Sequence, residues 1–238
     1  MNKGILALAL CAALAGAGVA SGPSAPAPAQ EVWAGKPYSQ WTKGDTSAVL
    51  SQSPWVKTQE IRLTQGRANA PRDSKITLRL RSALPIRQAL VRQKQLDAKY
   101  DKMNEADRAA FDAKTKGLMD CPACADNYVV TLSAKSENDP GYDVVFELLK
   151  GATLAALQKY VYLSNDRGER RPLIHFVAPK SGGEEAMFFF PRLDDSGKPL
   201  LAPRDKRLLF RFSDSNVSAT VNFEFDVSKI VLNDSVIF

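Results

Sequence analysis

The segment KRLLFRF at residues 206–212, followed by TVNFEFDV at residues 220–227, decides the fold. In the first segment, apolar side chains alternate with Arg207 and Arg211. In the second, apolar residues occupy every other position: Val221, Phe223, Phe225 and Val227. Because successive side chains of a strand point to opposite faces of a sheet, each segment predicts a strand with one buried face.

Similar apolar or alternating segments occur upstream. They predict further strands at residues 55–64, 75–81, 128–135, 159–165, 171–179 and 185–191. The intervening stretches carry the Gly, Asn, Pro and Asp residues that favour turns, as in NDRGER at 165–170. We therefore expect a mainly β (α+β) fold, an antiparallel β-sandwich or a partly closed barrel.

Between residues 84 and 119 the spacing of the apolar residues changes from that of a strand to that of a helix. This change predicts a helical insertion between strands. Pro85 lies where the first turn of a helix tolerates proline, and Asn104 can cap a second helix with Asp107 three residues later. A short helix is also expected at residues 41–50, with Thr42 as its cap and Asp45 completing a capping box. Two short helices interrupted at Gly151 are expected at 143–159.

The N-terminus has the composition of a secretory signal peptide, with Lys3 before an apolar run from Ile5 to Ala20. We assign residues 1–20 to this signal, 21–37 to a Pro/Ala-rich flexible linker, and 38–238 to a single β-rich domain. The expected location is the periplasm or the extracellular space. The alternatives are an anchor formed by an uncleaved signal and a lipoprotein modified at Cys11.

Positive charge is concentrated in one part of the sequence. Residues 57–116 hold 15 Lys/Arg and 7 Asp/Glu, whereas residues 117–238 hold 14 and 17. A basic region can attract an anionic envelope component or another envelope protein, but a solvated helical face is the simpler and favoured explanation. Export argues against nucleic acid as a partner.

Among the motifs of this sequence, Cys121-Pro-Ala-Cys124 is the one whose side chains are best suited to carry out chemistry. An exported protein with one cysteine pair favours a structural disulfide. A redox dithiol is the first alternative, but a helix is expected before the motif, and Asp120 and Asp126 would raise the pKa of a thiolate. A metal site is the second, but only His175 could add a non-carboxylate ligand. No cofactor or metal is expected.

Other candidate residues carry weaker signals. A hydrolase could use His175 or the acid pairs 184–185 and 194–195, but no G-x-S-x-G motif accompanies them, and the acids lie beside predicted turns. Consecutive phenylalanines at 188–190 must place a ring on each face of a strand. We therefore consider a candidate binding surface formed by Phe188, Phe190, Arg79 and Arg81.

Two stretches resemble a group of uncharacterised bacterial exported proteins. They are the tryptophan-led helix at 41–50 that runs into Ser53-Pro54-Trp55, and the later sequence FFFPR at 188–192. This resemblance implies an exported bacterial protein and no activity. The sequence thus predicts a non-enzymatic envelope or secreted domain that binds a partner or supports surface structure. The alternative is a thiol-disulfide redox protein that uses Cys121 and Cys124.

Overall fold

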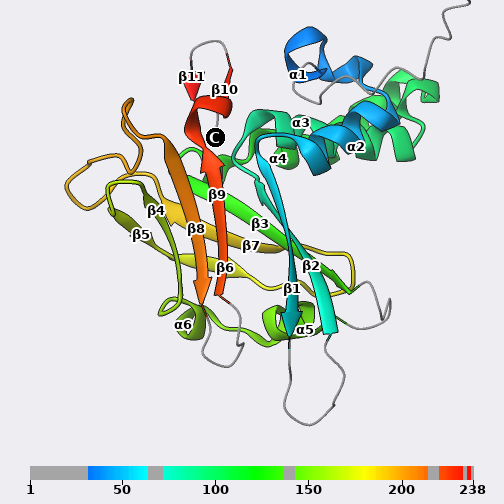
Figure 1. Cartoon of the computed structure of the whole chain (residues 1–238). Coiled ribbons are helices and arrows are strands. Elements are labelled where there is room, and N and C mark those ends of the chain that lie inside the picture. The colour runs from blue at the N-terminus through cyan, green and yellow to red at the C-terminus, as the bar shows by residue number, and fades with distance from the viewer. Residues whose placement is uncertain (1–31, 64–71, 137–142, 214–219, 233–234, 237–238) are drawn as a thin grey trace, which may run out of the picture.

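A computed structural model describes residues 32–63, 72–136, 143–213, 220–232 and 235–236. Within these ranges the chain forms two antiparallel sheets, with the predicted helices at their ends (Figure 1). The first sheet has the order β1-β2-β3-β7-β6 and the second β5-β4-β8-β9. Both sheets are open, so the sandwich is confirmed and a closed barrel does not form. No helix of the described residues is long and apolar enough to cross a membrane.

The first sheet consists of β1 (Val56–Leu63), β2 (Arg72–Leu80), β3 (Asn127–Ser136), β6 (His175–Val177) and β7 (Ala186–Pro191). The second consists of β4 (Val161–Asn165), β5 (Arg170–Pro172), β8 (Arg207–Ser213) and β9 (Thr220–Asp226). Strands β10 (Val231–Leu232) and β11 (Ser235–Val236) form a separate short ribbon. Register is set by pairs such as Phe210 with Phe223 and Val130 with Phe188.

The helices form where the local sequence signals place them, except for α1, which lies in the expected linker. They are α1 (Val32–Gly35), α2 (Lys43–Gln52), α3 (Leu84–Asp97), α4 (Glu105–Asp120), α5 (Val144–Gly151) and α6 (Leu154–Leu157). Short 3₁₀ turns occur at Tyr38–Gln40, Tyr100–Lys102, Pro122–Cys124 and Val227–Lys229. Thr42 and Asp45 form the expected capping box of α2, and Asn104 caps α4 by accepting the Asp107 N–H. The helical insertion at 84–119 is thus confirmed.

The core lies between the two sheets and is rich in aromatic rings. Phe210 of β8 contacts Phe188 and Phe190 of β7, with ring centroids 5.6 and 6.1 Å apart. Phe223 of β9 is the cross-strand neighbour of Phe210 in the second sheet, and the centroids of the two rings are 6.5 Å apart. The rings of Phe188, Phe190 and Phe210 are fully buried, so these contacts hold the sheets together by apolar burial and edge-to-face packing.

Two predicted boundaries are wrong. The linker expected over 21–37 ends earlier, because Val32–Gly35 form a helix and the Trp33 ring packs against Trp55 at 4.9 Å. The single strand expected over 171–179 is divided between the sheets, since β5 pairs with β4 and β6 pairs with β7. The chain changes sheet at Leu173, which is fully buried between the two. Residues 1–31, which include the expected signal peptide and most of the expected linker, lie outside the described residues.

Candidate functional site

The segment between β7 and β8, residues 192–206, carries the chain from one sheet to the other. We call it the braced loop. At its start the Arg192 N–H donates to the Asp126 carbonyl at 2.9 Å, and the Arg192 carbonyl accepts from the Leu200 N–H at 3.0 Å. Asp194 then closes a tight turn by accepting from Ser196 and from the Lys198 N–H. The loop is therefore ordered by its own polar groups where it leaves the sheet.

The strongest attachment of the braced loop is an ion pair between Asp205 and Arg167. The Asp205 side chain is 1% exposed, and Arg167 comes from the turn between β4 and β5. The other carboxylate oxygen of Asp205 accepts from the Ala202 N–H at 2.7 Å. Arg167 also donates to Glu169 at 2.8 Å. A buried carboxylate is costly unless it is paired, so this ion pair couples the loop to the β4–β5 turn.

Asn165 reinforces the same attachment from the end of β4. Its amide nitrogen donates to the Leu200 carbonyl at 2.8 Å. Its carbonyl oxygen accepts from the N–H groups of Arg167 and Glu169, both at 3.0 Å. The turn is completed by Gly168, whose φ of +83° favours glycine. One buried amide thus orders the turn and holds the loop.

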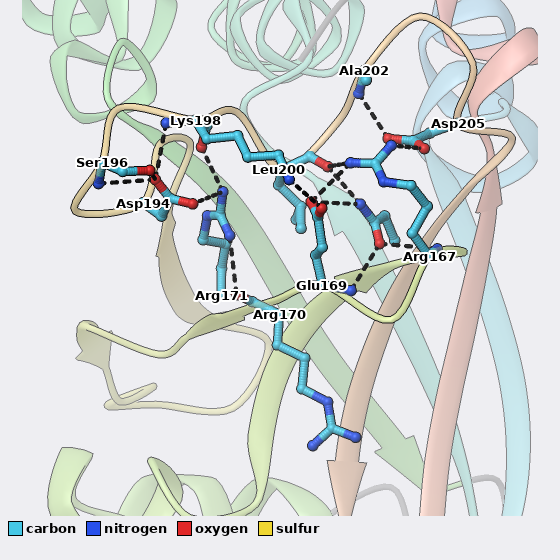
Figure 2. A network of polar contacts seen from close by, with 11 residues as sticks. Arg167, Glu169, Arg170, Arg171, Asp194, Ser196, Lys198, Leu200, Ala202 and Asp205 are labelled. Carbon is cyan, nitrogen blue, oxygen red and sulfur yellow. Dashed lines mark hydrogen bonds and ion pairs between the residues drawn. The ribbon is translucent and has the colours of Figure 1, made fainter.

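Further ion pairs and hydrogen bonds extend these contacts into a network (Figure 2). Lys198 pairs with Glu169 at 2.5 Å, and Arg171 donates to the Lys198 carbonyl at 2.6 Å while lying 3.7 Å from Asp194. Hydrogen bonds from Arg167 and Lys198 lower the pKa of the Glu169 carboxyl to about 2. The Ser196 hydroxyl, which donates to Asp194, lowers the pKa of that carboxyl. Both acids are therefore ionised at neutral pH.

The braced loop forms one wall of a groove of about 1210 Å³. The end of β9 and the following turn, which lie beside Lys206 and Arg207, also line the groove, and Tyr128 of β3 contributes. Apolar lining is supplied by Leu193, Pro199, Leu201, Pro203 and Val227. Leu193 is 52% exposed, an unusual exposure for a large apolar residue in this chain. The groove therefore offers apolar surface to a ligand at a site with a fixed wall.

Tyr128 and Arg192 line this groove as a stacked pair. The Arg192 guanidinium carbon lies 4.9 Å from the centre of the Tyr128 ring, and two of its nitrogens donate to the Cys124 carbonyl at 3.0 and 2.9 Å. Burial raises the pKa of the Tyr128 phenol, and the Arg192 charge opposes that rise. Tyr128 is therefore neutral at physiological pH, and the positive charge of this pair belongs to Arg192.

The groove also has a charged rim. Arg207 lies 3.6 Å from Glu224, and Asp226 accepts from Ser228 and lies 3.7 Å from Lys229. Arg204 and Lys206 are exposed, and within the described residues neither side chain has an ion pair or hydrogen bond. Their two positive charges form no ion pair among the described residues, although the Lys206 backbone N–H donates to the Asp166 carboxylate at 3.2 Å.

The predicted cysteine pair is bonded. The disulfide joins Cys121 and Cys124 in the short segment between α4 and β3. This is the expected junction between the helical insertion and the sheet. The redox alternative stays a prediction. Among the described residues, no group of three His, Cys, Asp or Glu side chains is placed to hold a metal ion.

The predicted binding surface does not form. Phe188 and Phe190 are fully buried between the sheets, because they share the inward-facing side of β7 with Ala186. Arg79 alternates with buried residues of β2 and so lies on the other face. There it pairs with Glu185 and donates to the Leu50 carbonyl at 2.8 Å. Arg81 follows on the same face, where burial lowers the pKa of its guanidinium.

The candidate hydrolytic groups lie in different places. His175 is exposed on β6 against the Phe189 ring, Glu184 accepts from Lys180 and Ser181 in a turn, and Asp194 belongs to the network above. Leu173, two residues before His175, is buried, whereas His175 is exposed. The described residues do not bring the histidine and the acids into one pocket.

Sequence reasoning missed the residues that form the groove. Arg167 and Asp205 are 38 positions apart, and Tyr128 lies far from both in the sequence. The Gly-containing turn at 165–170 was recognisable, and the APRDK segment at 202–206 combines proline with closely spaced charges. Neither signal specifies that the two segments meet.

Comparison of the chain with protein-family models, with curated proteins and with solved structures finds no match. The function must therefore be inferred from the groove and its charges.

Proposed function

We propose that this chain is an exported, non-enzymatic binding domain and that the groove beside the braced loop holds its partner. The partner is an anionic envelope component or another envelope protein. The observation that carries this proposal is the combination of an exposed apolar lining with a loop fastened by buried charges. A wall that is already ordered loses little conformational entropy when a ligand binds.

Support for export comes from the sequence and from the cysteines. The apolar run ending at Ala20 has the form of a cleavable signal, and a disulfide persists in oxidising compartments. Expression of the full chain in bacterial cells with an intact secretion system tests the proposal of export. We expect a mature N-terminus near Ser21 outside the cytoplasm. A full-length cytosolic product with two free thiols would contradict export.

Site-specific photo-crosslinking in cells that make the protein tests the groove. A benzoyl-phenylalanine is placed at Leu193, inside the groove, and in a separate variant at Ile174, outside it. The two positions are matched, because Leu193 is 52% and Ile174 46% exposed. We expect a defined adduct from position 193 that is absent from position 174. Equal labelling at both positions, or none at either, would show that the groove has no resident partner.

A further inference from the structure

The groove has positive side chains that form no ion pair, and this restricts its partner. Arg204 and Lys206 lie close together in the sequence on the braced loop, and neither side chain forms an ion pair among the described residues, although Asp166 accepts from the Lys206 backbone N–H at 3.2 Å. Arg207, in contrast, is matched by Glu224 across β8 and β9. The positive side chains without an ion pair are therefore those of Arg204 and Lys206, which can attract carboxylates or other anions.

The same groove carries acidic groups beside this basic segment, because Asp226 pairs with Arg207 across β8 and β9 and the Val227 N–H donates to the Lys206 carbonyl at 2.8 Å. Glu224 and Asp226 line it from the end of β9. A nucleic acid or sulfated glycan has negative charge at every repeat, so it would meet these acids along with the basic residues. A polypeptide can place carboxylates at selected positions and leave the rest neutral. The mixed charge of the groove therefore favours a peptide over a uniform polyanion.

The apolar lining supports the same class of partner. Leu193, Leu201 and Pro203 offer contacts to apolar side chains between the charged positions. The volume of about 1210 Å³ exceeds that of an ordinary small-molecule pocket and suits several residues of an extended chain. A membrane surface fits poorly, because lipid binding needs apolar groups that protrude, and these residues line a hollow.

We infer that the groove binds an extended acidic segment of a partner polypeptide whose carboxylates meet Arg204 and Lys206 and whose apolar side chains contact Leu193. This inference rests on the proposed function, since it names the partner of the same groove. The network of Arg167, Asp205 and Glu169 keeps the loop in place for that contact.

Fluorescence anisotropy with the purified full chain tests the inference. The probe is a labelled random copolymer of glutamate and tyrosine, compared with polyglutamate, dextran sulfate and phosphatidylglycerol vesicles. The variant R204E/K206E reverses the two free charges. The matched control, K114E/K159E, makes the same change in net charge at two exposed lysines outside the groove. Near-ultraviolet circular dichroism confirms that each variant is folded.

We expect the copolymer to bind more tightly than polyglutamate. R204E/K206E should weaken copolymer binding roughly tenfold, and the control roughly threefold or less. L193A should remove the advantage of the copolymer over polyglutamate. Equal losses in the two charge variants would overturn the inference, as would dextran sulfate or vesicles binding as tightly with the same dependence on Arg204 and Lys206.

The two proposals fail in different ways. If the copolymer does not bind but the crosslink at position 193 forms, the peptide partner is wrong and the groove remains a binding site. If the crosslink is also absent, the proposed function is wrong as well.

Discussion

The helical hairpin of α3 and α4 and the braced loop both lie outside the sheets, but they are held in opposite ways. Helix α4 has a good cap and sixteen residues, yet only Thr115 among them is buried. The braced loop has no helix or strand of its own, yet Asp205 is almost completely buried and paired with Arg167. Regular backbone structure and firm attachment are therefore separate properties in this chain.

The difference has a physical origin. A helix satisfies its own backbone hydrogen bonds, so α4 can remain at the surface with few contacts. A loop that crosses between two sheets has no regular backbone ladder, so side chains must satisfy part of its backbone. Here Asn165, Asp194 and Asp205 accept or donate those bonds. The attachment of the braced loop is thus a consequence of its irregular backbone.

Removal of the Asp205 carboxylate should give the largest effect. D205A leaves Arg167 without its buried partner and the Ala202 N–H without an acceptor, so we expect a loss of about 3 kcal/mol in the free energy of unfolding. Urea denaturation measures it. The matched change D112A removes an exposed carboxylate of α4 that accepts from the Tyr100 hydroxyl, and should cost less than about 1 kcal/mol. Equal losses would abolish the contrast between the two regions.

The disulfide connects the two regions and comes next. The Cys121–Cys124 bond follows α4, and Arg192 at the start of the braced loop donates twice to the Cys124 carbonyl. For so short a loop the chain-entropy model predicts a loss of about 2 kcal/mol in C121S/C124S. We expect faster hydrogen exchange at the end of α4 and at residues 122–128. An unchanged urea midpoint would mean that the bond does not stabilise this junction.

Local signals made several helices and strands predictable. The Thr42–Asp45 capping box, the Asn104 cap and the alternation in β8 and β9 each depend on residues close together in the sequence. For the same reason the strand at 185–191 was predictable, and both its faces had to hold phenylalanines. Which of those faces would be buried was not, because that depends on the other sheet.

The groove could not be predicted, because its contacts are between distant segments. The ion pair of Arg167 and Asp205 spans 38 positions, and the bond from Arg192 to Cys124 spans 68. A charged residue in a turn has the same sequence signature whether it is solvated or buried in an ion pair. The division of residues 171–179 between two sheets has a similar cause, because it depends on which distant strands pair with each half. Leu173 is buried at the point where the chain passes from one sheet to the other.

Helix α4 should open without unfolding the sandwich. Phe111 is half-buried and packs edge-on against Tyr100, with ring centroids 5.3 Å apart. We expect F111A to cost about 1 kcal/mol and to speed hydrogen exchange in α4 alone. The comparison variant is F176A, a half-buried ring that contacts Phe188 of the core at 5.1 Å. It should speed exchange throughout the first sheet. If F111A has the same wide effect, the hairpin is part of the cooperative core.

The smallest expected effect is the response of the braced loop to acid. The pKa of Glu169 is lowered from 4.5 to about 2 by Arg167 and Lys198, so ionised Glu169 stabilises the folded state above its unfolded pKa. That contribution should decline as the pH falls from about 4.5 to about 2. Urea midpoints of the wild type and E169Q should therefore differ at pH 6 and converge towards pH 2.

K198A provides the control for this titration, because it removes one of the two partners that hold Glu169 ionised. The carboxyl pKa, followed by nuclear magnetic resonance, should rise in K198A but stay below 4.5, since Arg167 remains. An ordinary pKa in the wild type would show that the contacts of the network do not persist in solution. The loop would then resemble α4 in being loosely held, and the wall of the groove would have to be ordered by its partner.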